Sequence, residues 1–98
     1  MKPKISSYVG YAIKSGNALF GITNITGKRK SFVVLYDIKL SNSSKEKLFM
    51  YLKRTGIEGF CVDVEELYPN KNCLAIGITE KNLALAIIKV IKESDINE

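Results

Sequence analysis

Three short apolar runs, separated by segments with helical periodicity, place the strongest constraint on the fold of this 98-residue chain. They cover residues 31–37, 59–63 and 73–78, and each stays apolar along most of its length instead of alternating with polar residues. Strands of this kind are typical of a sheet that is covered on both faces. We therefore predict a single α/β domain over residues 1–98, a three-layer α-β-α sandwich with a small mixed sheet of about four strands.

Apolar residues recur at helical spacing in three longer segments. Ser43, with Glu46 three residues later, fits a capping box at the start of the middle segment, and Asn42 is a rival N-cap. Thr79 is the expected cap of the last segment. These signals predict long helices over residues 4–15, 43–55 and 80–92.

Two glycines five residues apart, Gly16 and Gly21, follow the first helical segment. Gly16 fits a helix C-cap, because glycine tolerates the left-handed conformation that a C-cap requires. Gly21 fits the opening of a second, shorter helix within residues 22–27, whose first-turn N–H groups would attract phosphate. Residues 17–20 then predict a very short strand. The alternative is that both glycines form turns and nothing more.

Composition limits the chemistry that this chain can perform. It contains no histidine, which removes the usual general base and the commonest metal ligand. We therefore expect no catalytic residues, no metal site and no cofactor. The net charge of +5 permits an anionic partner but also serves solubility. The basic triplet Lys28-Arg29-Lys30 has the same two interpretations, a solvated strand start or a nucleic-acid contact.

Cysteine usage and apolar run length bear on the compartment of the protein. Cys61 and Cys73 lie in apolar runs, so we expect buried, reduced thiols, with a disulfide as the alternative. No apolar run approaches the ~20 residues that a membrane span needs. The N-terminal residues do not have the pattern of a secretion signal. We expect a cytoplasmic protein without a membrane partner.

Several markers occur in a recognisable order along the chain. The first is Gly10-Tyr11-Ala12-Ile13-Lys14-Ser15-Gly16, with Gly21 following it. The second is the apolar strand that ends at Asp37, followed by a Ser/Asn-rich cap and a Lys-rich helix. Glu66-Leu67 and the strand over residues 73–79 complete the order. Over about residues 5–90 the chain resembles the ribosomal L-seven-Ae family, and within it the small bacterial, ribosome-associated YlxQ-like type.

This resemblance implies a sandwich that binds structured RNA, often a kink-turn. In that family the start of the second helix enters the RNA, and a loop before the last strand covers a flipped-out nucleotide. The family's glycine corresponds to Gly21, and its base-reading polar residues correspond to Thr23 and Asn24. The RNA-binding residues that the resemblance implies are Gly21, Thr23, Asn24, Asn70, Lys71 and Asn72, with Lys14 and Lys28 in support.

Three classes of function remain open. The leading hypothesis is a non-catalytic protein that binds ribosomal or other structured RNA, with a ribosomal protein as a further candidate partner. The second is a protein-interaction module on the same sandwich, with degenerate RNA-contacting loops. The third, a small enzyme, has the least support, since no nucleophile–base pair or nucleotide-binding loop is visible. The charge around Gly21 and Asn70 distinguishes the first two.

Overall fold

The computed structural model describes residues 2–67 and 73–96. The long helices and strands that the sequence predicts are all present, with bounds that shift by a few residues. In chain order the elements are α1 (Lys2–Lys14), β1 (Ala18–Phe20), α2 (Ile22–Ile25), β2 (Val33–Tyr36), α3 (Asn42–Thr55), β3 (Glu58–Cys61), α4 (Val64–Leu67), β4 (Ala75–Ile78) and α5 (Lys81–Ile96).

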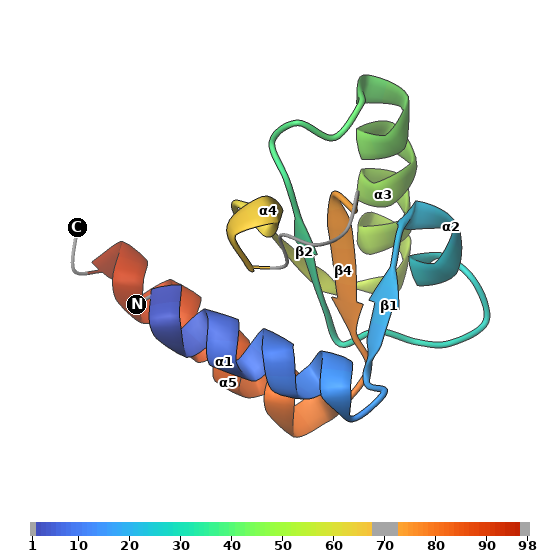
Figure 1. Ribbon diagram of the computed structural model, residues 1–98. Coiled ribbons are helices and arrows are strands. Elements are labelled where there is room, and N and C mark those ends of the chain that lie inside the picture. The colour runs from blue at the N-terminus through green and yellow to red at the C-terminus, as the bar shows by residue number, and fades with distance from the viewer. Residues whose placement is uncertain (1, 68–72, 97–98) are drawn as a thin grey trace.

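The four described strands form one mixed sheet in the order β1-β4-β2-β3 (Figure 1). β4 is antiparallel to both of its neighbours, so that Ile76 lies opposite Phe20 of β1 and Leu35 of β2. β2 and β3 are parallel, with Val33 opposite Glu58. A parallel pair needs a long crossover connection, and α3 provides it.

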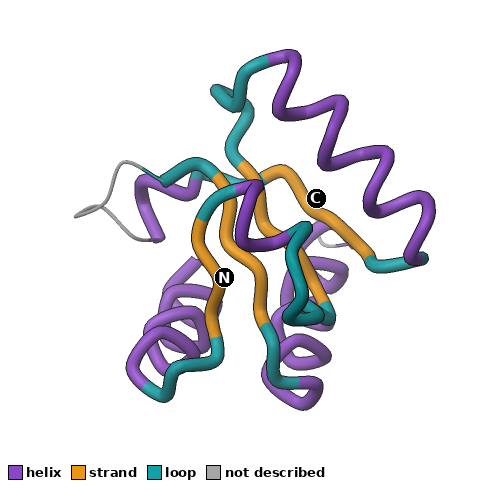
Figure 2. The backbone as a smooth tube through the Cα atoms, turned by 90° about the vertical axis from the view of Figure 1, so that its right-hand side faces the viewer, coloured by secondary structure: helices purple, strands orange, loops and turns teal. Residues whose placement is uncertain are grey.

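Helices cover both faces of the sheet, and Figure 2 shows the strands running between them. Successive residues of β2 point to opposite faces. Val33 and Leu35 pack with α1, α4 and α5, whereas Val34 packs with α2 and α3. All three side chains are fully buried, which explains why the strand is apolar throughout. The predicted three-layer α-β-α sandwich with a mixed sheet is therefore confirmed.

Gly16 ends α1, as the sequence predicts. Its φ is 77°, in the left-handed region. The N–H groups of Gly16 and Asn17 donate to the carbonyl oxygens of Ile13 and Ala12 at 3.2 and 2.7 Å. This pair of bonds is the Schellman motif, which satisfies carbonyls at the helix end. It turns the chain directly into β1.

The N-cap of α3 differs from both sequence candidates. Ser41 occupies that position with extended backbone, and its Oγ accepts the N–H of Ser44 at 3.3 Å. Asn42 and Ser43 therefore lie inside the first turn and cap nothing. The helix starts one residue earlier than predicted because Ser41 supplies the same hydroxyl chemistry as Ser43.

α5 is capped by a carboxylate and not by the predicted hydroxyl. Glu80 accepts the N–H groups of Asn82 and Leu83 at 3.1 and 2.9 Å. A negative charge at this position is favoured by the positive end of the helix dipole. The Oγ1 of Thr79 instead accepts a hydrogen bond from Arg29 at 3.1 Å.

Candidate nucleic-acid interface

Gly21 forms the turn from β1 into α2. Its φ of 86° and ψ of 156° belong to a region that residues with a Cβ almost never occupy. The Gly21 N–H donates to Ala75 O at 3.0 Å, and Gly21 O accepts the N–H of Ile25 at 3.0 Å. A Cβ built on Gly21 would meet no atom within 4 Å. Glycine is thus required here by backbone conformation, and the space beside it is open.

Thr23 and Asn24 are exposed on the short helix that Gly21 opens. The Nδ2 of Asn24 donates to Phe20 O at 2.8 Å, which uses one of its two amide N–H groups. The other N–H and the Oδ1 of Asn24 remain available to a partner. The N–H groups of a helix's first turn have no intrahelical acceptor. This edge therefore offers hydrogen-bond donors and acceptors side by side to an approaching ligand.

Lys14 lies away from this edge. It is the last residue of α1, at the Ala18 end of β1, whereas Gly21 follows the Phe20 end (Figure 1). Three residues of strand separate the two ends by roughly 10 Å. The structure therefore does not bring Lys14 to the side of Thr23 and Asn24. Sequence proximity suggested otherwise, because the strand between them is so short.

Arg29 joins two loops at the Lys14 end of the sheet. Its Nη2 donates to Gly16 O and to Thr79 Oγ1, each at 3.1 Å. This is a contact within the protein, and neither interpretation of the basic triplet anticipated it. Lys28, beside it in the sequence, is exposed in the loop after α2. Of the predicted site, Asn70, Lys71 and Asn72 lie outside the described residues.

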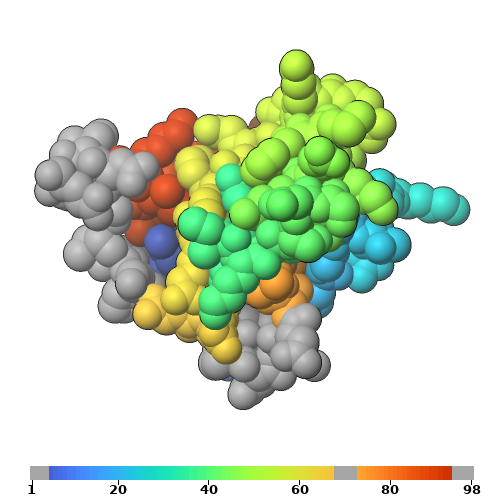
Figure 3. All heavy atoms as spheres, turned by 90° about the horizontal axis from the view of Figure 1, so that it is seen from above, coloured from blue at the N-terminus to red at the C-terminus, as the bar shows by residue number. Residues whose placement is uncertain are grey.

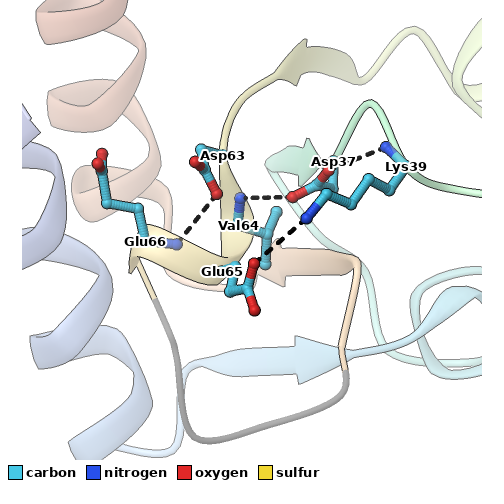
Figure 4. A network of polar contacts seen from close by, with 6 residues as sticks. All are labelled: Asp37, Lys39, Asp63, Val64, Glu65 and Glu66. Atoms are coloured by element: carbon cyan, nitrogen blue, oxygen red, sulfur yellow. Dashed lines mark hydrogen bonds and ion pairs between the residues drawn. The ribbon is translucent and has the colours of Figure 1, made fainter.

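Asp37 is a buried carboxylate that sequence reasoning did not single out. It is 2% exposed, and its two oxygens accept the N–H groups of Lys39 at 2.9 Å and Val64 at 3.0 Å (Figure 4). Asp37 thereby fixes the turn after β2 and the start of α4. The sequence signal for this role was the polar residue at the end of an apolar strand.

The α4 side of the molecule is acidic. The Oδ1 of Asp63 accepts the N–H of Glu66 at 3.1 Å, and Glu65 pairs with Lys39 at 3.3 Å (Figure 4). The hydrogen bond from Lys39 to Glu65, together with the negative charge of Glu65, raises the pKa of Lys39 above its usual 10.5. These carboxylates repel phosphate, so this side disfavours a nucleic acid.

The α3 side has the opposite charge. The sequence of α3 contains four cations, Lys45, Lys47, Lys53 and Arg54, and one carboxylate, Glu46. In the view from above, residues 37–55 lie between α2 on one side and α4 on the other (Figure 3). The α3 side and the α4 side of the molecule therefore carry opposite charge. A polyanion that contacts Thr23 and Asn24 would be attracted over α3 and repelled from α4.

The cysteine prediction is wrong in part. Both thiols are free, as expected, but Cys61 is exposed and Cys73 is half-buried, with its Sγ donating to Ala75 O at 2.9 Å. Cys61 reaches solvent because it is the last residue of β3, an edge strand. Among the described residues, no three His, Cys, Asp or Glu side chains gather as metal ligands would. The described helices also include none that is long and apolar enough to cross a membrane.

Comparison with known proteins bears on the fold alone. No model of a protein family matches the sequence, and no curated protein matches it either. A solved structure of a protein of unknown function from Bacillus halodurans is similar, with a TM-score of 0.83. The similarity covers 91% of this chain and 97% of that chain at 18% sequence identity. The α-β-α arrangement is thus shared with an experimentally determined structure.

Proposed function

We propose that this chain is a non-catalytic, ribosome-associated RNA-binding protein of the cytoplasm, which recognises structured, kink-turn-like RNA at Gly21, Thr23 and Asn24. The observation that carries the proposal is the open turn at Gly21, with two exposed polar side chains directly after it. The resemblance to the L-seven-Ae family and the positive charge of α3 support it.

Each residue of this edge has a separate role. Gly21 lets the RNA backbone approach, because no side chain stands in the open space beside the turn. Asn24 keeps an acceptor and one donor free for a base edge, as recognition of an unpaired or non-canonically paired base requires. Thr23 adds a hydroxyl that both donates and accepts. Asn70, Lys71 and Asn72 remain part of the proposed surface on the resemblance alone.

The direct test compares two RNA hairpins, one with a kink-turn containing tandem G·A pairs and one in which Watson–Crick pairs replace them. The protein should bind the kink-turn hairpin more tightly. Thr23→Ala should weaken that binding by about tenfold, since a good base contact is worth roughly 1–3 kcal/mol. It should leave stability nearly unchanged, because the side chain of Thr23 is exposed.

Asn24→Ala should weaken binding as well, and it should also lower stability slightly through loss of the bond to Phe20 O. Asn82→Ala is the matched control, because Asn82 is an exposed amide on α5, on the opposite face of the sheet. Equal affinity for the two hairpins would exclude kink-turn recognition. If Thr23→Ala and Asn24→Ala bind as tightly as Asn82→Ala, the RNA site lies elsewhere.

A protein-interaction module is the second candidate. It is favoured by the large apolar side chain of Ile38, which is 71% exposed. Substitution of Ile38 by serine should then weaken binding of a protein partner and leave RNA affinity unchanged. Loss of RNA affinity in the same variant would argue against a separate protein site.

A further inference from the structure

A shallow depression of about 330 Å³ lies between α2 and α3. Thr26, the residue after α2, forms one wall, and four residues of α3 form the other. The α3 residues recur at helical spacing, so they make one stripe along two turns of the helix. They are Lys47, Met50, Tyr51 and Arg54.

The two cations of the depression are free to meet a ligand. Lys47 and Arg54 are exposed, and the ion pairs between described residues join Lys39 to Glu65 and Lys92 to Glu58 instead. The guanidinium of Arg54 lies 5.7 Å from the centre of the Tyr51 ring. Stacking of this kind restrains the guanidinium and leaves its N–H groups directed outward.

The shape and the surroundings of the depression fit a nucleic-acid strand. Lys47 and Arg54 are seven residues apart, which spaces them by roughly 10 Å along α3. Met50, 72% exposed, offers an apolar surface between them for a sugar or an unstacked base. Thr26 follows Asn24 by two residues, so the depression begins within one helical turn of the Thr23–Asn24 edge in the chain. It also lies on the α2 side of α3, whereas α4 lies on the other side of residues 37–55 (Figure 3).

We propose that this α2–α3 depression is a second RNA-contacting surface, where Lys47 and Arg54 bind the phosphates of the strand that leaves the Thr23–Asn24 edge. The inference rests on the proposed RNA-binding function and adds a path for the RNA. The first edge reads bases, and the depression supplies the salt-dependent part of the affinity. An acidic protein segment is the alternative occupant, and the experiment below separates the two.

The test measures affinity for the kink-turn hairpin over a series of salt concentrations. Each phosphate contact contributes about 0.7–0.9 to the slope of log K against log salt. The double variant Lys47→Gln/Arg54→Gln should therefore lower the magnitude of that slope by about 1.4–1.8. The matched control is Lys81→Gln/Lys89→Gln, which removes the same charge from exposed positions on α5, beyond the sheet. The control should keep the wild-type slope.

A single variant separates charge from stacking. Arg54→Lys keeps the positive charge and loses the planar group over Tyr51. The slope of log K against log salt should stay close to that of the wild type. A weaker affinity at fixed salt would then measure the contribution of the planar guanidinium group. Thermal melting of every variant establishes that the fold is retained, as expected for exposed positions.

Each outcome has a distinct meaning. An unchanged slope in Lys47→Gln/Arg54→Gln, or equal losses in both double variants, overturns the inference even if Thr23→Ala still weakens binding. If Lys47→Gln/Arg54→Gln reduces the slope while Thr23→Ala binds the hairpin as tightly as the wild type, the RNA-contacting role of the depression is supported and the base-reading role of the Thr23–Asn24 edge is rejected. Failure of the wild-type protein to bind either hairpin overturns both proposals. If polyglutamate displaces the hairpin as effectively as unlabelled RNA does, the occupant is an acidic protein segment.

Discussion

The same substitution, glycine to alanine, should have opposite effects at Gly21 and Gly10. A Cβ at either position meets no atom within 4 Å, so steric clash contributes to neither result. Gly10 lies inside α1, where alanine is the better helix former by about 1 kcal/mol. Gly21 has a φ of 86° and a ψ of 156°, where a residue with a Cβ is strained by about 1–3 kcal/mol.

The net magnitudes follow from these two values. At Gly21, alanine also reduces the entropy of the unfolded chain, which offsets about 0.4–1 kcal/mol of the strain. We therefore expect Gly21→Ala to lower the free energy of unfolding by about 1–2 kcal/mol. Gly10→Ala should raise it by about 1 kcal/mol. In a domain of this size, 1 kcal/mol changes Tm by roughly 4–8 °C, so the two variants should melt well apart on either side of the wild type.

Urea unfolding followed by far-ultraviolet circular dichroism is the appropriate assay, since the chain contains no tryptophan. The slope of free energy against urea should match that of the wild type in both variants, because the substitutions leave the surface exposed on unfolding unchanged. Wild-type stability in Gly21→Ala would refute the strain argument. A loss of stability in Gly10→Ala would show that a neighbouring group packs too closely against Gly10 to accommodate a Cβ.

Three further results are expected. Asp37→Asn should lower the free energy of unfolding by about 1–3 kcal/mol in the same urea assay, because it sets an amide donor against one of the two N–H groups that Asp37 accepts, and the N–H of Val64 is buried. Ser41→Ala should cost about 1 kcal/mol and Ser43→Ala close to nothing; the reverse order would restore the capping box as the start of α3. In the native protein a thiol reagent should modify Cys61 much faster than Cys73, as mass spectrometry after brief labelling would show.

The features that could be predicted from the sequence are those that neighbouring residues in the chain determine. Continuous apolar runs identified β2 and β4, since burial on both faces leaves no room for polar alternation. The roles of Gly16 and Gly21 were predicted because their spacing matches a helix end and a helix start. In the structure both have a positive φ. The length of β1 followed from the residues available between Gly16 and Gly21, and that of α2 from the residues between Gly21 and Gly27.

Features that depend on distant segments were not predictable in this way. Asp37 is indistinguishable from any polar strand end until Val64, far along the chain, presents an N–H to it. Arg29 resembles its two lysine neighbours in sequence, yet its acceptors lie on the loops at Gly16 and Thr79. The exposure of Cys61 depends on β3 being at the edge, which is a property of strand order and not of the strand.

The strand order also has a consequence for how the chain folds. β4 is the last strand in the sequence, yet it is the partner of both β1 and β2. During synthesis, α3 can bring β2 and β3 together early, but a two-stranded pair is marginal in water. The sheet therefore forms only when β4 is present. Its pairing with β1 closes a loop that spans most of the chain, and such non-local pairing is slow. We expect the nascent protein to expose the apolar edges of β1 and β2 until Ile78 has been made, and to fold in one late step.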